Sequence, residues 1–139
     1  MKTINYFFSG SLLFLLDRVT KLWALQSYAH AVAFNRGVAW SFFHSESPII
    51  FAGVTFMVLI IMALVAWHAY SRLHQQQVIW AEVLILAGAA GNLWDRFMYG
   101  GVIDFIALSY QDFYWPLFNV ADCYIVIGLL FMLFEVLRS

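Results

Sequence analysis

Two aspartates stand on either side of one short segment of a very apolar chain: Asp104 within GGVIDF at 100–105, and Asp122 within FNVAD at 118–122. Two carboxyl groups that are brought close together cannot both ionise cheaply, so they share one proton and one of the two pKa values rises. The ionised acid can then accept a proton from water while the protonated acid polarises a carbonyl oxygen. This pair therefore indicates a site that could activate water to hydrolyse a peptide bond.

Each of these acids also has an ordinary structural explanation. Asp122 falls in the first turn of a predicted helix, where the helix dipole favours an acid, and Asn119 with Asp122 resembles a capping box. Asp104 could likewise end a turn. Taken singly, either acid fits the structural explanation better than a catalytic one. The two acids together favour a catalytic site more strongly, because they stand at the two ends of one short segment and should emerge at the same level of a membrane.

Charged residues also occur within the apolar stretches, where a charge near the middle of a bilayer costs at least about 2.5 kcal/mol on insertion scales. Asp17 and Lys21 are four residues apart. On a helix this spacing puts them on one face, with the acid on the N-terminal side. They could compensate each other's charge, or they could help to orient a site, and the spacing leaves both interpretations open.

A second polar group follows the small residues GAAG at 88–91, which would let two membrane helices approach closely. Asn92, Asp95 and Arg96 are spaced i, i+3 and i+4, so they share a helical face. Asp95 could simply neutralise Arg96. Alternatively, Asn92 and Arg96 could donate hydrogen bonds to a substrate backbone or to an anionic head group.

The elements that must position these groups are predicted to be membrane helices. Of the 139 residues, 64% are hydrophobic and 11% are charged, whereas about a quarter of an ordinary soluble domain is charged. A helix needs about 20 mostly apolar residues to span a bilayer, and four stretches qualify: 6–25, 49–67, 78–97 and 120–137. The sequence therefore predicts a membrane all-α fold with four transmembrane helices in one integral membrane domain, residues 1–139.

Local signals mark several helix ends. Ser47 followed by Pro48 is typical of an N-cap and the first helical position, and Asn119 can cap the last helix. Arg72, His74 and three glutamines predict a short polar turn between the second and third helices. In the longer connections, residues 26–48 suggest short strands with a turn at Gly37. The aromatic residues of 98–118 favour a segment that lies in the membrane interface.

The distribution of basic residues bears on orientation. Four spans put both termini on one side of the membrane. With Arg18, Lys21 and Arg96 assigned to a site, the remaining cations number three on the side of the termini and one on the other: Lys2, Arg72 and Arg138 against Arg36. This excess favours cytoplasmic termini. The net charge is −1 and no basic stripe exists, so nucleic acid is not an expected partner.

Other kinds of chemistry have weaker support in the sequence. Cys123 lies about 100° round the helix from Asp122 and no histidine is placed by sequence to activate it. No metal-ligand spacing such as HExxH is present, so no metal or cofactor is expected. A proton-coupled or ion-coupled carrier would need ionisable groups through the membrane depth, and a non-enzymatic scaffold would use the acids only to cap helices.

Four segments, in order along nearly the whole chain, resemble the lipoprotein signal peptidase family, also called signal peptidase II. They are the D-x-x-x-K of Asp17 and Lys21, NRGVAW at 35–40, the run from GNLWDR at 91–96 to GVIDF at 101–105, and FNVAD at 118–122. Any single segment is a weak signal. The ordered set, at fitting separations, is specific.

The resemblance implies four transmembrane helices with cytoplasmic termini, a small extracytoplasmic β-cradle and an interfacial segment over the active site. It implies an aspartic endopeptidase of the bacterial inner membrane that cuts prolipoproteins just before a diacylglyceryl-modified cysteine, among membrane lipids, and that globomycin-type antibiotics inhibit. The motifs place its catalytic dyad on Asp104 and Asp122. Residues that shape or support the site fall on Asn35, Gly37, Asn92, Arg96, Asn119, Ala121, Asp17 and Lys21.

Overall fold

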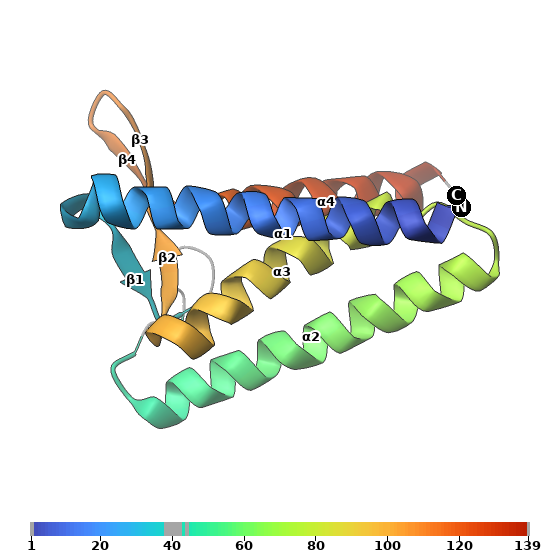
Figure 1. The fold of residues 1–139 in the computed structure, drawn as a ribbon, viewed down its shortest axis with the longest axis horizontal. Helices are drawn as coiled ribbons and strands as arrows, with labels where there is room; N and C mark the ends of the chain where they lie inside the picture. Colours follow the sequence, from blue (N-terminus) through green and yellow to red (C-terminus); the bar gives the residue numbers. More distant parts are fainter. Residues whose placement is uncertain (1, 38–42, 44, 139) are drawn as a thin grey trace.

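The computed structural model describes residues 2–37, 43 and 45–138, and these form long helices with two small antiparallel sheets at one end (Figure 1). The helices are α1 (Lys2–Ser27), α2 (Pro48–His74), α3 (Trp80–Tyr99) and α4 (Val120–Arg138). A short 3₁₀ turn, Ala29–Ala31, follows α1. Each stretch that the sequence predicts as a span is helical over nearly all of its length. By length and hydropathy, α2 and α4 qualify as membrane-crossing helices in the described part of the chain.

The predicted turn between the second and third helices is shorter than expected. Arg72 and His74 belong to the last turn of α2, which is capped at Gln75. Helix α2 continues because Arg72 has partners here: its guanidinium donates to Gln77 Oε1 at 3.0 Å and to Glu82 Oε1 at 2.9 Å. At the other end of α2, Ser47 is the N-cap and Pro48 the first helical residue, as predicted, although the Ser47 side chain makes no capping hydrogen bond.

Helix α3 is the central helix, because it packs against α1, α2 and α4. Two glycines set its distance from α4. A Cβ atom on Gly128 would lie 2.7 Å from the carbonyl oxygen of Ala81, and one on Gly88 would collide with the carbonyl oxygen of Ala121. The prediction that the small residues of 88–91 permit close helix approach is therefore confirmed at Gly88.

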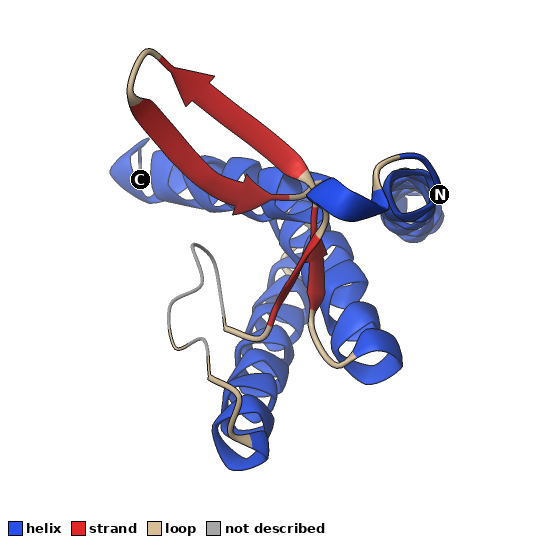
Figure 2. Ribbon diagram, turned by 90° about the vertical axis from the view of Figure 1, so that its left-hand side faces the viewer, coloured by secondary structure: helices blue, strands red, loops and turns tan. Residues whose placement is uncertain are grey.

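The two sheets lie at the end of the molecule opposite the chain termini (Figures 1 and 2). Strand β1 (Ala33–Asn35) pairs antiparallel with β2 (Val102–Asp104). Strands β3 (Ile106–Tyr110) and β4 (Phe113–Phe118) form a hairpin that projects away from the helices. Among the described residues of 26–48, the expected strands are represented by β1, whose partner is the distant β2. Gly37 lies in a bend, and the expected strand residues 38–42 lie outside the described residues.

The burial pattern reverses that of a soluble domain. The side chains of Asp17, Lys21 and Asp95 are fully buried, whereas Phe7 is 79% and Leu137 is 78% exposed. Charged residues are almost never fully buried in soluble proteins unless they are paired. Apolar helix faces turned outward around buried charges are what a hydrocarbon solvent requires. The molecule is therefore built to place its apolar helix faces in a membrane and its charges inside.

Candidate active site

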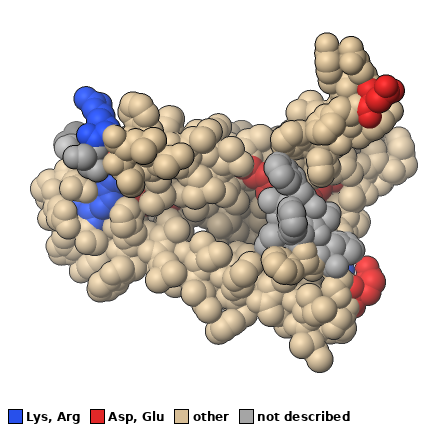
Figure 3. Space-filling view, turned by 180° about the vertical axis from the view of Figure 1, so that it is seen from behind, with Lys and Arg blue, Asp and Glu red and all other residues tan. Residues whose placement is uncertain are grey.

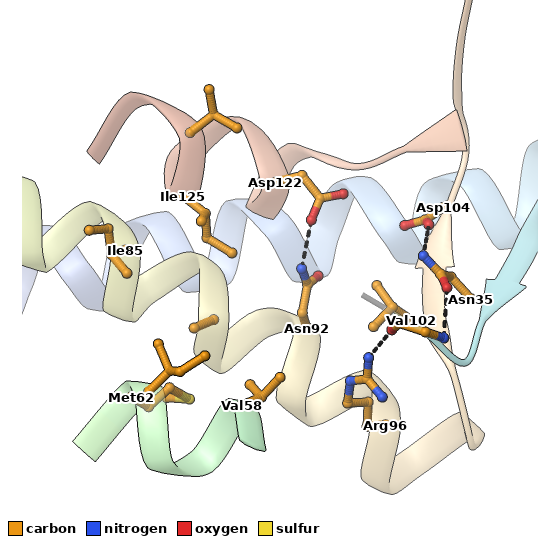
Figure 4. Close-up of a pocket in the computed structure, with 14 residues that line it drawn as sticks. Asn35, Val58, Met62, Ile85, Asn92, Arg96, Val102, Asp104, Asp122 and Ile125 are labelled. Atoms are coloured by element: carbon orange, nitrogen blue, oxygen red, sulfur yellow. Dashed lines mark hydrogen bonds between the residues drawn. The ribbon is translucent and has the colours of Figure 1, made fainter. Parts of the chain in front are cut away.

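Asp104 and Asp122 line the same cavity, whose volume is about 250 Å³ (Figure 4). Asp104 is the last residue of β2, and Asp122 lies in the first turn of α4. Away from the acids the cavity is walled by apolar side chains of three helices, among them Met62 of α2, Ile85 of α3 and Ile125 of α4. The cavity thus joins a polar end, which holds both acids, to an apolar end between the helices.

Asp104 is 3% exposed and accepts two hydrogen bonds from carboxamides. Asn35 Nδ2 donates to its Oδ2 at 3.0 Å, and Asn119 Nδ2 donates to its Oδ1 at 2.7 Å. Burial, together with the charge of nearby Asp122, raises the pKa of Asp104 to about 6, although the two carboxamide hydrogen bonds oppose this rise. Asp104 is therefore a carboxyl group that can hold a proton far more readily than an exposed aspartate.

Asp122 takes part in the helix cap that the sequence predicts. The backbone N–H of Asn119 donates to Asp122 Oδ2 at 3.1 Å, and the N–H of Asp122 donates to Asn119 Oδ1 at 3.0 Å. This reciprocal pair is a capping box. The other oxygen, Oδ1, accepts from Asn92 Nδ2 at 2.8 Å and faces the cavity. Asp122 therefore caps α4 and also faces the cavity. Asn119 is hydrogen-bonded to both acids.

Behind the acids lies a cluster of four charged side chains. Arg18 donates to Asp17 at 2.7 Å and to Asp95 at 2.5 Å, and Lys21 contacts the same two acids at 3.1 and 2.8 Å. Asp95 therefore pairs with cations of α1 and does not neutralise Arg96. Removing one member of such a buried cluster leaves an uncompensated charge, so the four residues stabilise the fold as a unit.

The cluster also holds the backbone beside each acid. Asp17 Oδ1 accepts from the N–H of Ala121, the residue before Asp122, at 3.2 Å. Asp95 Oδ2 accepts from the N–H of Ile103, the residue before Asp104, at 3.2 Å. A Cβ atom on Gly91 would collide with the Asp17 carboxylate. Close packing of α1 on α3 thus fixes both acids through their neighbours in the chain.

Arg96 holds the segment that follows β1. Its guanidinium donates to the carbonyl oxygens of Arg36, at 3.3 Å, and of Gly37, and it lies 5.4 Å from the ring centroid of Phe51. The N–H of Gly37 in turn donates to Asn35 Oδ1 at 2.9 Å. Of the two interpretations of Arg96, neutralisation by Asp95 is thus excluded. In this structure the backbone carbonyls that accept from Arg96 belong to the protein's own residues, Arg36 and Gly37, and not to a substrate.

The structure separates the predicted site residues into two groups. Those that line the cavity are Asn35, Gly37, Asn92, Arg96, Asp104 and Asp122. Those that hold them from behind are Asp17, Lys21, Asn119 and Ala121, and all four are completely buried. In the part of the chain that the structure describes, no group of three His, Cys, Asp or Glu side chains is arranged to hold a metal ion. Residues 38–40 of the NRGVAW motif lie outside the described residues.

Sequence reasoning missed two features. The first is the apolar end of the cavity, since its residues look like any others on an apolar helix. The second is a charged group at the opposite end of the molecule. There Glu82 is fully buried and accepts from Arg72 at 2.9 Å, with His68 at 3.0 Å and Glu135 bonded to the same arginine. An acid at the start of an apolar span was the available signal for Glu82.

Known proteins resemble this chain over nearly its whole length. A family model described as signal peptidase (SPase) II matches residues 10–138. The lipoprotein signal peptidase of Pseudoalteromonas atlantica is 32% identical and covers 98% of this chain and 91% of its own length. The lipoprotein signal peptidase of Solibacter usitatus is 36% identical, and the match covers 93% of this chain and 88% of that protein.

A solved structure described as a bacterial membrane enzyme has the same fold. It superposes with a TM-score of 0.70 at 22% identity, over 96% of this chain and 88% of its own. A second solved bacterial membrane enzyme gives a TM-score of 0.66, also at 22% identity. With a family match over nearly its whole length and relatives above 30% identity, this chain belongs to the signal peptidase II family.

Proposed function

We propose that this chain is a membrane aspartic endopeptidase that removes signal peptides from prolipoproteins, cutting just before the diacylglyceryl-modified cysteine. The observation that carries the proposal is the cavity that Asp104 and Asp122 share, with Asn119 hydrogen-bonded to both acids. The names of the relatives in the same family support the substrate class.

The reaction needs one ionised and one protonated acid, with a water molecule between them and the peptide. The ionised carboxylate accepts a proton from this water as its oxygen attacks the scissile carbonyl carbon, and the protonated acid gives its proton to the carbonyl oxygen. When the tetrahedral intermediate collapses, the C–N bond breaks. The amine then takes the proton that came from water, and the hydroxyl proton returns to the second acid. One water is consumed for each bond cut.

The whole chain, residues 1–139, forms a single peptidase domain with four membrane spans in this proposal. Helices α2 and α4 qualify by composition alone. Helix α1 has 26 residues and α3 has 20, which at 1.5 Å per residue correspond to about 39 and 30 Å, enough for a hydrocarbon core of about 30 Å. Of their charged residues, Asp17, Arg18, Lys21, Glu82 and Asp95 are paired inside the molecule, and Arg96 is hydrogen-bonded to backbone carbonyls. These contacts lower the cost of placing the charges in a membrane.

Both termini lie in the cytoplasm in this proposal, and the site lies near the extracytoplasmic face of the bacterial inner membrane. The termini are at the same end of the molecule, opposite the sheets (Figure 1). Asp104 ends β2, one of these strands, and Asp122 lies in the first turn of α4. On the face drawn in Figure 3, Lys and Arg atoms gather mainly at the end with the termini, and the middle is almost uncharged. An excess of basic residues on one side favours the cytoplasm for that side.

The apolar end of the cavity suits a substrate that arrives within the bilayer. A diacylglyceryl group stays dissolved in the membrane, so the substrate approaches sideways between helices and keeps its lipid among the membrane lipids. Met62, Ile85 and Ile125 would meet apolar parts of the substrate while the scissile bond reaches the acids. Globomycin-type inhibitors would block the same acids.

The test is cleavage by the purified full chain in lipid nanodiscs or detergent. Two substrates are compared, a synthetic prolipoprotein with a diacylglyceryl-modified cysteine and the same peptide without the lipid. Mass spectrometry should find a new N-terminus at the modified cysteine of the first substrate only. A chain that cuts neither substrate, or cuts both equally at another bond, would overturn the proposal.

A further inference from the structure

We infer that Lys21 and Asn92 are positioning residues that hold Asp122 in its ionised state as the base of the dyad, which leaves Asp104 to carry the dyad's proton as the acid. The inference rests on the proposed function, because it assigns roles within that reaction. It is based on the hydrogen bonds behind the cavity that connect Lys21 of α1 to Asn92 of α3, and Asn92 to Asp122 of α4.

The carboxamide of Asn92 has one orientation that its neighbours permit. Lys21 Nζ lies 2.8 Å from Asn92 Oδ1. An ammonium group has three donors and no acceptor, so it can only face the oxygen of a carboxamide. The nitrogen, Nδ2, is thereby turned toward Asp122 Oδ1, also at 2.8 Å. Lys21 thus polarises an N–H that points at Asp122, and an N–H donor favours the ionised form of a carboxyl group.

The other oxygen of Asp122 is held by a helix end. Asp122 Oδ2 accepts from the backbone N–H of Asn119, the residue before α4, at 3.1 Å. Unpaired N–H groups and the dipole at a helix N-terminus favour a negative charge in the first turn. Both oxygens of Asp122 therefore accept a hydrogen bond from a donor whose position is fixed by other parts of the fold.

Asp104 is in a different environment. Its donors are the uncharged carboxamides of Asn35 and Asn119, and these are oriented by backbone N–H groups that donate to their oxygens. It ends a strand and is 3% exposed, so burial disfavours its charge without a helix end to compensate. The raised pKa of Asp104, about 6, agrees with its role as the protonated partner.

Charged and titratable groups lie near the dyad on α1, α3 and α4. Helix α1 contributes Lys21, Asp17 and Arg18, and α3 contributes Asp95 and Arg96. Within α4, Cys123 is the titratable neighbour of Asp122. The cluster formed by Asp17, Arg18, Lys21 and Asp95 contains two acids and two bases, so its charges cancel. The charge of Lys21 acts on both acids. Among the described residues, Lys21 is also the one member of the cluster that bonds to Asn92, and this bond connects it to Asp122.

The experiment compares the pH profiles of two matched variants, Asn92→Leu and Asn35→Leu, using kcat/KM for cleavage of the lipidated prolipoprotein. Each substitution removes one carboxamide donor, from Asp122 in the first variant and from Asp104 in the second. Loss of a donor raises the pKa of the acid that loses it. For the base this moves the acidic limb of the profile to higher pH, and for the acid it moves the alkaline limb to higher pH.

The expected result is a shift of the acidic limb by about one pH unit in Asn92→Leu, and of the alkaline limb by a similar amount in Asn35→Leu, given the usual strength of a hydrogen bond to a charged group. Lys21→Met should move the acidic limb in the same direction as Asn92→Leu. Lys21→Arg, which keeps the charge, should restore most of the profile. A merely structural role would lower activity at every pH without moving either limb.

The opposite pattern, with the alkaline limb moving in Asn92→Leu and the acidic limb in Asn35→Leu, would overturn the assignment, as would profiles that only lose height. If either leucine variant does not fold in detergent, alanine at the same two positions makes the same comparison, because it also removes the donor. Failure of the proposed function is a separate outcome, since the wild-type chain would then leave the lipidated substrate uncut.

Discussion

Asp17 on α1 accepts a hydrogen bond from the backbone N–H of Ala121 on α4, at 3.2 Å. The contact joins the first helix of the chain to the last one, directly beside Asp122. Since Asp17 also bonds to Arg18 and Lys21, the charged cluster and the position of Asp122 depend on one carboxylate. A change to the cluster should therefore affect both stability and catalysis.

Asp17→Asn tests this dependence. The variant leaves Arg18 and Lys21 with too little negative charge in a buried site. Breaking a buried ion pair by removing one partner costs about 3–5 kcal/mol. We expect a strongly lowered thermal unfolding temperature in detergent and little remaining cleavage.

Glu46→Gln is the matched control for Asp17→Asn. Glu46 pairs with Arg36 at 3.0 Å, but its side chain is 82% exposed. Exposed pairs contribute about 0–1 kcal/mol, so this variant should unfold near the wild-type temperature. Equal destabilisation by the two variants would contradict the role given to the buried cluster.

Gly91→Ala tests the close packing of α1 on α3. A Cβ atom at this position would collide with the carboxylate of Asp17. Either the helices separate or the carboxylate moves, and both outcomes disturb the backbone beside Asp122. We expect reduced cleavage together with a lower unfolding temperature. Gly53→Ala is the control because nothing lies within 4 Å of its added Cβ. Alanine there should leave cleavage intact and stabilise the helix by up to about 1 kcal/mol.

Asn119→Ala removes a helix cap and the link between the acids in one step. Loss of the cap should cost about 1 kcal/mol of stability. Loss of the hydrogen bond to Asp104, and of the cap geometry around Asp122, should cost more in activity, on the order of 10- to 100-fold in kcat/KM. The comparison is Ser47→Ala, since the Ser47 side chain makes no capping hydrogen bond. A similar small effect from both variants would mean that Asn119 serves only as a cap.

Asp104→Asn should change how stability depends on pH. The folded-state pKa of Asp104, about 6, lies above the ordinary aspartate pKa of 3.8. The folded state therefore binds this proton more tightly than the unfolded state does, and wild-type stability falls as pH rises from about 4 to about 6. The asparagine variant does not lose this stability. Its unfolding temperature relative to wild type should therefore rise between pH 4.5 and pH 7.5. A difference that stays constant with pH would contradict the buried, raised-pKa environment.

The sequence predicts the helices well and their partners poorly. Apolar stretches of the right length, Pro48 at a helix start and Asn119 at another are local signals, and each is found where expected. The pairing of β1 with β2 is not a local property, because almost 70 residues separate Asn35 from Val102, its partner in the register. Only the packed helices bring these two strands together.

Within the site, residue types could be predicted but not their contacts. The spacing of Asn92, Asp95 and Arg96 indicates a shared face, yet Asp95 bonds to α1 while Arg96 bonds to the segment after β1. Helix packing decides between neighbours that are only about 100° apart on one helix. The link from Lys21 through Asn92 to Asp122 also involves three helices, so no spacing along the sequence could have indicated it.

The most direct measurement for the dyad is the rate of prolipoprotein cleavage by Asp104→Asn and by Asp122→Asn, each measured beside Asp112→Asn in the exposed hairpin turn. Proton transfer by a placed side chain contributes about 10²- to 10⁴-fold to a rate. Each dyad variant should therefore lose at least about 100-fold, while Asp112→Asn keeps the wild-type rate. Cleavage near the wild-type rate by either dyad variant would contradict the account.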